Sequence, residues 1–559
     1  MGPQDRHDDA SLGDRPRHEQ HPRVFEPATI VLMAVVGVVG AIIGLQILTT
    51  LGFTPNTSII GVLLAIVVSR IPLRIFRQFR SIHRQNLVQT NISSATFGAA
   101  NSLLVPIGIP VLVGRPDLVV PMLIGATMGM LIDLAMLYWF FDSRLFPGPA
   151  PWPLGIAAAE AILAGDEAGR RGTLLGAGAA AGVLGSSGLF GLLNPILGAG
   201  GIPMAALGIA FLGNAWALAM FGVGLLTRAY SPALLGVNLD QRLVPHGIMI
   251  GAGLVALVQA VLFVVRRGRQ QENAGLQVHA PAEDHAMPLT RTARDARRGL
   301  FRGLGLYLIA ALLLTALAGL WTEMPVARLA EWVVFAAIAC IAAEFIVGFS
   351  AMHAGWFPAF ATALIFLIVG LALGFPAPAA ALLVGFVASG GPAFADAGYD
   401  FKAGWLLRGM GRDPDFEREG RKQQAVAAGV GLVTALVVVA VFHQLYFDSG
   451  MFPPVARAYA ATIESGVDPT RAASLFVWAI PGAVIQLVGG PRRQLGVLFG
   501  TGLLILNPTA GWVVLAGVGV RVVLERWWGN GAGSERAVVA AGFIAGDALW
   551  AFGSSLVRL

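Results

Sequence analysis

The sequence predicts an all-α polytopic membrane protein with about 16 transmembrane helices, some of them broken or re-entrant, arranged in two halves. Three observations support this fold class. Only 13% of the 559 residues are charged, whereas soluble domains carry roughly 25%. Many apolar runs reach the roughly 20 residues that cross a bilayer core. The 71 glycines suit helices that pack closely in lipid and segments that break within it.

Charge and motifs exclude several function classes. The net charge is +6, but the basic residues lie in loops between spans, which indicates membrane orientation rather than nucleic-acid binding. Cys340 is the single cysteine, so an intramolecular disulfide is excluded. The sequence has no Walker loop, G-x-S-x-G, H-E-x-x-H or C-x-x-C pair. We therefore expect neither an enzyme nor a self-contained ATP-driven pump, no metal site and no cofactor. What remains is a carrier driven by an ion gradient, or a channel.

Residues 1–24 mix both charges with proline and predict a disordered cytoplasmic tail. The N-terminal transmembrane half covers residues 25–265. A short Ala-rich segment from Pro153, which holds Glu160, is too short to cross and is interpreted as an interfacial or re-entrant helix. An additional crossing is expected near 188–201 or 231–243, because the next basic loop would otherwise lie on the wrong side. The predicted spans are 27–51, 58–73, a run that follows 85–94 and ends near 114, then 118–141, 173–190, 202–226 and 245–265.

Residues 266–302 are polar and basic and predict a cytoplasmic linker before the C-terminal half, 303–559. Direct counting over the chain gives fifteen spans and the orientation rule gives sixteen. The run 495–520 is interrupted at Asn507-Pro508, so a single crossing and a hairpin both stay open. No sequence repeat is visible, and an internal duplication is only a suspicion. The spans predicted here are 303–321, 327–349, 358–375, 378–397, 425–443, 472–489, 495–520 and 537–557.

Polar residues within apolar runs are the candidate functional residues, because such groups are costly in a bilayer and usually face the bundle interior. The amide-rich stretch 85–94 favours a substrate path, although an ordinary helix cap is the alternative. The candidates for substrate binding are Gln89, Asn91, Asn101, Asn214, Glu344 and His353. The candidates for proton coupling or a gate are Asp396, Asp400, Lys402, Asp547 and Glu160.

The charges that follow the span at 378–397 are the most informative of these. On a helix, Asp396 and Asp400 share a face by their i,i+4 spacing. Two carboxylates on one face repel each other, so one of them can hold a proton near neutral pH. An ion-pair cluster with Lys402 explains the spacing equally well. The position before a basic loop favours a cytoplasmic gate or coupling element over the substrate site itself.

Three stretches resemble motifs of the oligopeptide transporter superfamily, which includes the yellow stripe-like metal-chelate carriers. Residues 85–90, Gln-Asn-Leu-Val-Gln-Thr, resemble the family's N-N-x-V-Q-T. Residues 400–405, Asp-Phe-Lys-Ala-Gly-Trp, followed by Arg-Lys-Gln-Gln at 421–424, resemble its D-L-K-T-G-Y and P-R-K-Q pair. Residues 542–547, Gly-Phe-Ile-Ala-Gly-Asp, resemble its G-L-I-A-G-E.

The resemblance covers most of the chain, and the sequence also departs from the family pattern. Phe401, Ala403 and Trp405 replace Leu, Thr and Tyr, and Asp547 replaces Glu; the K-I-P-P-R motif of some eukaryotic members is absent. The chain therefore resembles a divergent prokaryotic branch. The resemblance implies about sixteen spans and proton-coupled symport of small oligopeptides or peptide-like metal chelates.

The leading hypothesis is thus a secondary active importer that works by alternating access. A passive channel is one alternative, and a membrane-embedded enzyme acting on a peptide or lipid-linked substrate is another. The expected partners are a small peptide or metal-chelate substrate and the lipid bilayer, with no nucleic acid, and a homo-oligomer stays open. The expected location is the inner membrane of a prokaryote, with the N-terminus in the cytoplasm.

Overall fold

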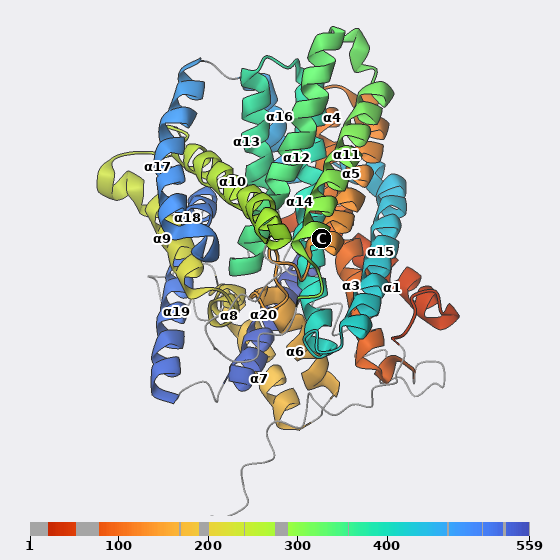
Figure 1. The fold of residues 1–559 in the computed structure, drawn as a ribbon, viewed down its shortest axis with the longest axis vertical. Coiled ribbons are helices and arrows are strands. Elements are labelled where there is room, and N and C mark those ends of the chain that lie inside the picture. Colours follow the sequence, from red (N-terminus) through yellow and green to blue (C-terminus); the bar gives the residue numbers. More distant parts are fainter. Residues whose placement is uncertain are drawn as a thin grey trace, which may run out of the picture.

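The computed structural model describes residues 21–51, 78–166, 169–188, 201–239, 241–273, 289–355, 357–466, 469–505, 507–528 and 533–557. Within these ranges most residues are helical, and the extended structure amounts to one isolated bridge between Phe141 and Phe146. Figure 1 shows the longer helices running side by side. The all-α fold class is confirmed.

The first half begins with α1 and ends with the long helix α10 (Figure 1). A buried rod near its start combines α3, a π-helical stretch η2 and α4. The bounds are α1 Pro27–Leu51, α3 Ile82–Phe97, η2 Gly98–Leu104, α4 Val105–Leu112, η3 Pro116–Leu118, α5 Val119–Phe140, α6 Pro153–Asp166, α7 Arg170–Ser186, α8 Met204–Leu212, α9 Ala215–Leu235 and α10 Val244–Asn273.

The second half begins with α11 and ends with α20 (Figure 1). Its bounds are α11 Ala293–Leu317, η5 Leu320–Thr322, α12 Val326–Ala354, α13 Ala359–Ala372, α14 Ala377–Leu407, α15 Pro414–Asp448, α16 Pro454–Ser465, α17 Pro469–Arg493, α18 Leu495–Leu504, α19 Pro508–Trp528 and α20 Gly533–Val557.

Ten helices of the described ranges are long and apolar enough to cross a bilayer. Three shorter apolar helices accompany them, at Val244–Ala256, Ala359–Ala372 and Leu495–Leu504. The predicted span at 58–73 and most of the crossing suspected at 188–201 lie outside the described residues. The total of sixteen therefore stays a prediction, whereas the polytopic character is confirmed.

Several predicted boundaries are wrong. The run 202–226 is two helices, because the chain breaks at Gly213 and Asn214 between α8 and α9. The region 231–243 holds the end of α9 and turns rather than a crossing. The span at 378–397 continues as helix to Leu407, so its charged residues lie within α14. The predicted tail includes residues 21–24, yet His21 and Val24 are buried.

The short helix α6 does not lie at the membrane interface, which was one of its two predicted positions. Most of its residues are buried, and it packs against α14 and α20. Two apparent single runs, 202–226 and 495–520, are each broken near an asparagine. Both breaks therefore place helix ends inside the bundle, as in transporters with discontinuous helices.

Helix contacts recur in matched form between the two halves. The contact of α1 with α3 in the first half corresponds to that of α12 with α14 in the second. If α3 corresponds to α14, then the contact of α3 with α15 corresponds to that of α14 with α5. In the same way, the contact of α7 with α20 corresponds to that of α17 with α10. Helices α3 and α14 are antiparallel, because Gln89 contacts Asp400 while Ser93 contacts Asp396. Such exchange of contacts is typical of inverted repeats related by a pseudo-two-fold axis. The arrangement therefore supports the suspected internal duplication.

The two broken helices are the clearest matched pair. Asn214 caps α9, because its Oδ1 accepts from the backbone N–H groups of Trp216 at 3.1 Å and Ala217 at 3.2 Å. Asn507 caps α19 in the same way, accepting from Ala510 N at 2.9 Å. An asparagine satisfies the free N–H groups at such helix starts.

Two arginines connect the broken helices reciprocally. Arg228 of α9 donates from Nη1 to the carbonyl of Leu503 in α18 at 3.1 Å. Arg521 of α19 donates from Nη1 to the carbonyl of Gly213, just after α8, at 2.5 Å. Each half thus supplies a cation to carbonyls that a helix end leaves without a partner.

Glycines set the distance between the paired helices. At Gly182 of α7, an added Cβ would lie 2.7 Å from the Phe543 carbonyl oxygen and 2.8 Å from the Cα of Gly546 in α20. At Gly176, on the same helix, an added Cβ meets nothing within 4 Å. Close approach of α7 and α20 therefore requires Gly182 but not Gly176.

We expect Gly182→Ala to lower the melting temperature of the detergent-solubilised protein, because overpacking costs about 1–3 kcal/mol. Gly176→Ala is the matched control and should leave the melting temperature unchanged or raise it, since alanine favours a helix by up to ~1 kcal/mol. Equal melting temperatures for the two variants would contradict the assigned contact between α7 and α20.

Candidate functional site

The amide-rich stretch of α3 faces the interior of the bundle. Every residue from Gln85 to Phe97 is buried, and Gln89 and Asn91 are fully so. Helix α3 lies among α1, α14 and α15, which cover it on several sides. A helix that buries its polar side chains must supply their hydrogen-bond partners from its neighbours, because lipid offers none.

Helix α14 supplies those partners with two carboxyl groups. Gln89 donates from Nε2 to Oδ1 of Asp400 at 2.5 Å, and Asn86 donates to Oε1 of Gln89 at 3.0 Å. One turn away, Ser93 donates to Oδ1 of Asp396 at 2.5 Å and Ser94 donates to its Oδ2 at 3.3 Å. The predicted shared face of Asp396 and Asp400 is thus present. We refer to these six side chains as the α3–α14 polar contact.

Neutral groups are the hydrogen-bond donors to both carboxyl groups. Neither Asp396 nor Asp400 takes part in an ion pair with the described residues. The Oδ2 atom of Asp400 has no hydrogen-bond partner, and the residue has no exposed surface. A buried, unpaired carboxylate is costly, and a proton removes the charge. Asp396 has two hydroxyl donors, so Asp400 is the group that more readily carries the proton.

Lys402 is not part of this contact. Its Nζ donates to the carbonyl of Gly148 at 2.7 Å and lies 4.5 Å from the centre of the Trp405 ring. The alternative of an ion-pair cluster among Asp396, Asp400 and Lys402 is therefore wrong in this arrangement. Lys402 instead connects α14 to the loop between α5 and α6.

A buried ion-pair network follows at the end of α14. Arg408 donates from Nε and Nη2 to the two carboxylate oxygens of Glu417 at 2.7 and 3.1 Å, and both side chains are fully buried. Arg408 also donates from Nη1 to Oε1 of Gln424 at 2.7 Å. Gln424 in turn donates to the Asp400 carbonyl at 2.7 Å, which links the network to the α3–α14 polar contact.

Arg421 extends this network to two distant segments. Its Nη1 donates to the Phe141 carbonyl at 2.5 Å, and its Nη2 donates to Oγ1 of Thr290 at 2.6 Å. Thr290 then donates to Oδ2 of Asp142 at 2.6 Å. The network consists of Arg408, Glu417, Arg421, Gln424, Asp142 and Thr290 and is called the Arg408–Glu417 network below.

The segment before α1 covers this network. Val24 donates its backbone N–H to Oε1 of Gln423 at 3.0 Å. The ring of His21 lies 5.5 Å from the ring of Phe416, between the centroids, and 5.3 Å from that of His83. Burial, and next the charge of Arg408, lower the pKa of His21 to about 3. His21 is therefore neutral at physiological pH and adds no charge to the network.

The remaining predicted residues lie elsewhere. Asn91 donates to the Ala427 carbonyl at 3.2 Å and contacts α15 rather than the carboxyl pair. Asn101 is buried in η2. Asn214 is the cap of α9, and its backbone N–H donates to the His353 carbonyl at 2.8 Å. The ring nitrogens of His353 are buried without a hydrogen-bond partner. The structure therefore does not bring these four to one substrate site.

Two of the predicted coupling residues have structural partners. Glu160 of α6 pairs with Arg171 of α7 at 2.5 Å. Asp547 of α20 accepts from the hydroxyl of Ser186 at 2.5 Å and from the backbone N–H groups of Met204 and Ala205, which begin α8. Both groups therefore hold helices together. Glu344 lies apart from the α3–α14 polar contact, beside Asp133 and Tyr307.

Sequence reasoning missed the buried character of the supposed basic loop. Arg408 and Arg421 are buried, and α15 begins at Pro414, before most of these basic residues. It also missed Glu417, Asp142, Thr290 and Tyr307. The i,i+4 spacing of Glu417 and Arg421 was a signal for one of these. Asp142 and Thr290 are 148 residues apart in the chain, so no local sequence pattern predicts their contact.

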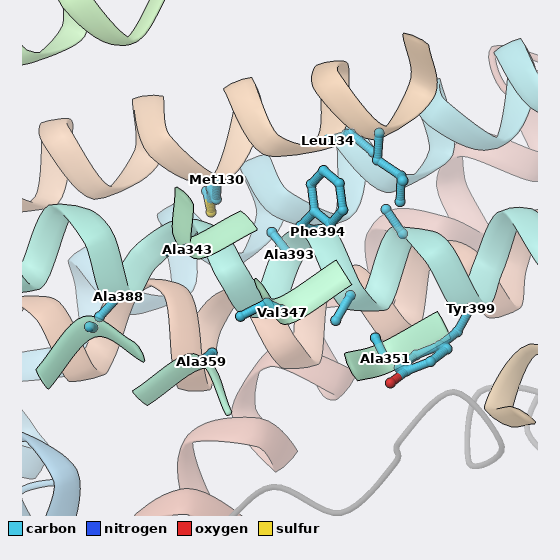
Figure 2. Packing of buried hydrophobic residues seen from close by; sticks show 14 of the residues in the cluster. Met130, Leu134, Ala343, Val347, Ala351, Ala359, Ala388, Ala393, Phe394 and Tyr399 are labelled. Atoms are coloured by element: carbon cyan, nitrogen blue, oxygen red, sulfur yellow. The ribbon is translucent and has the colours of Figure 1, made fainter. Parts of the chain in front are cut away.

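Helix packing around the carboxyl pair relies on small residues. Figure 2 shows Ala343, Val347 and Ala351, one on each turn of α12, following α14 toward Tyr399. An added Cβ at Gly391 would lie 3.2 Å from a methyl of Val347. Asp396 and Asp400 have almost no exposed surface, so each carboxyl oxygen needs either a hydrogen-bond donor from a neighbouring helix or a proton of its own.

A comparison with known protein families finds a match over most of the chain. A family model described as OPT oligopeptide transporter protein matches residues 27–238 and 186–558, which together cover nearly the whole chain. A search among curated proteins finds no match.

We expect Glu417→Gln to destabilise the protein by about 3 kcal/mol or more, because it leaves the buried guanidinium of Arg408 without its counter-ion. Glu419→Gln, on the same helix and paired with Lys422 across 3.9 Å near the surface, should cost within about 0.5 kcal/mol. Denaturant unfolding in detergent, followed by tryptophan fluorescence, measures both. A Glu417→Gln variant as stable as Glu419→Gln would exclude the buried ion pair.

Proposed function

The chain belongs to the oligopeptide transporter family, and from this premise we propose that it is a proton-coupled importer of small oligopeptides or peptide-like metal chelates. Membership makes it a membrane transporter of oligopeptides or related substrates. The proton as driving ion, import by alternating access and the prokaryotic inner membrane are the proposed parts.

The observation that carries the proposal is the pair Asp396 and Asp400. Two carboxyl groups lie one turn apart on α14, are buried, and accept hydrogen bonds from neutral side chains of α3. Transporters that use proton gradients need an intramembrane group that gains and loses a proton. Asp400, with one oxygen lacking a partner, suits this role, and loss of its proton would create repulsion with Asp396.

Protonation is coupled to structure because the contact joins the two halves. Gln89 and Ser93 belong to the first half, and both aspartates belong to the second. A change in charge on Asp400 therefore changes the strength of the contact between α3 and α14. In alternating access one half moves against the other around a central site, so a contact of this kind can link proton movement to that motion.

The Arg408–Glu417 network is the proposed gate. It closes one end of α14 by joining α14, α15, the segment at Thr290 and the loop at Asp142. Basic residues crowd this end, which favours the cytoplasmic side. Opening the gate requires several charge-assisted hydrogen bonds to break, and each of these is stronger than a hydrogen bond between neutral groups.

The proposed substrate is either a small peptide or a peptide-like metal chelate. Among the described residues there is no group of three or more His, Cys, Asp or Glu side chains suited to a metal ion. A chelate brings its own ligands and needs no such group. The passive channel is the second candidate, and saturable uptake that depends on a gradient separates it from the importer.

Uptake into proteoliposomes with and without an inward proton gradient tests the proposal. The probes are a radiolabelled alanine tetrapeptide and a ferric amino-carboxylate chelate. We expect saturable uptake of one probe that rises with the gradient and collapses with a protonophore. Equal flux of both probes regardless of the gradient would establish a passive channel instead.

We expect Asp400→Asn to abolish gradient-driven uptake while sparing expression and substrate exchange. Asparagine keeps the hydrogen bond from Gln89 but cannot release a proton. Asp415→Asn, a surface change beside Arg418, is the matched control and should transport normally. Normal gradient-driven uptake in Asp400→Asn would contradict a role of Asp400 in proton coupling and leave it a structural role only.

A further inference from the structure

A second group of buried ionisable side chains lies away from the α3–α14 polar contact. It comprises Asp133 of α5, Tyr307 of α11 and Glu344 of α12, and α14 covers it at Gly390. Asp133 and Glu344 are 0% and 1% exposed. Figure 2 shows part of the apolar surroundings: Met130 and Leu134, which flank Asp133 on α5, and Ala343, next to Glu344.

The hydrogen bonds of this group are incomplete unless a proton is present. The hydroxyl of Tyr307 donates to Oδ1 of Asp133. Oδ2 of Asp133 and both carboxyl oxygens of Glu344 accept no well-formed hydrogen bond, although the Tyr307 hydroxyl also lies near Glu344. Yet Glu344 lies within hydrogen-bonding reach of Asp133. Two carboxylate oxygens approach each other in this way only when one of them carries a proton.

The surroundings exclude the other ways of satisfying these oxygens. The orphan atoms have no surface that water could reach. Neither residue takes part in an ion pair with a described cation, and the described side chains form no group of three acids, histidines or cysteines for a metal. The other titratable groups facing the pair are Tyr307 and Cys340. At this point α14 contributes Ser389 and Gly390, which are not ionisable.

Glycine at position 390 is required for this arrangement. A Cβ built there would collide with the carboxyl group of Asp133. The backbone of α14 at Gly390 therefore packs directly against the carboxyl group of Asp133. Because α14 also carries Asp396 six residues further along, one helix, with Pro392 in its interior, connects the two buried acidic groups.

We propose that Asp133 and Glu344 hold a proton between them and form a second proton-binding site, which gains and loses a proton during transport. The proton lies on Glu344 and is donated to Oδ2 of Asp133, since Tyr307 already donates to Oδ1. One proton leaves a single negative charge on the pair, and a second proton leaves it neutral. The part that concerns transport rests on the proposed function, whereas the presence of the proton does not.

The site joins the two halves of the chain at a second place. Asp133 is on α5 of the first half, whereas Tyr307 and Glu344 are on helices of the second. Losing the shared proton leaves two buried negative charges facing each other across this boundary, which favours separation of α5 from α12. Regaining it restores the hydrogen bond and favours closure.

Infrared spectroscopy of the reconstituted full-length protein tests the presence of the proton. A protonated carboxyl group gives a C=O band that is separate from carboxylate bands and shifts in D2O. We expect Glu344→Gln to remove part of this band at neutral pH. We expect Asp133→Asn to keep the Glu344 acid but shift its band, because the carboxylate that accepts its hydrogen bond is replaced by an amide. Glu331→Gln, on the same helix but half-exposed and paired with Arg328 at 2.6 Å, should leave it unchanged. An unchanged band in both site variants would overturn the proposal.

Tyr307→Phe keeps the test decisive if a carboxyl variant fails to fold. It removes the hydroxyl donor to Asp133 and leaves both acids in place. We expect the acid band to persist and change frequency, because the remaining hydrogen bond to Asp133 changes in strength. A band unaffected by Tyr307→Phe would place the proton away from this pair.

The number of protons moved per substrate tests the role in transport. It is measured by balancing a pH gradient against an opposing gradient of whichever probe named above is taken up. We expect Glu344→Gln to lower the ratio by one proton per substrate while retaining exchange. Loss of the band with an unchanged ratio would overturn the transport role. If the normal protein shows no gradient-driven uptake, the proposed function fails, and the infrared result still decides whether the proton is there.

Discussion

The polar contact between α3 and α14 is the interaction on which much of the structure depends. Amide and hydroxyl groups of one helix donate hydrogen bonds to two carboxyl groups of the other, and both carboxyl groups are buried. Each group removed from this contact would leave another buried group without a partner, which costs more than the hydrogen bond itself. The surrounding helices are therefore constrained to keep α3 and α14 antiparallel and in register.

Small residues make that constraint achievable. Glycine at positions such as 182, 390 and 391 allows helices to approach until backbone meets side chain or backbone. In lipid this close packing replaces the hydrophobic drive that assembles soluble proteins. Because the same contacts recur with the halves exchanged, each half depends on the other for its partners. The reciprocal bonds of Arg228 and Arg521 to the broken helices follow the same principle.

The buried charged and acidic groups of α14 lie in two different environments. Arg408 and Glu417 neutralise each other at one end of α14. Further along α14, the carboxyl groups of Asp396 and Asp400 have neutral donors instead of cations. One helix thus carries a neutralised ion pair at its end and two carboxyl groups without a counter-ion in its interior. The proposed function assigns the first to a gate and the second to proton coupling.

The amino-acid sequence by itself determined the membrane class, most helix positions, the resemblance to a transporter family, and the shared face of Asp396 and Asp400. These follow from composition, hydropathy and i,i+4 spacing, which are local properties. The partners of those residues are set by tertiary structure: Gln89 lies 311 residues from Asp400, and Arg421 lies 131 residues from Thr290. Local pattern also failed where polar residues serve as caps, as at Asn214, because a cap and a ligand-binding amide look alike in sequence. Only the fold decided which buried charges have a counter-ion and which have none, since that depends on which helices pack together.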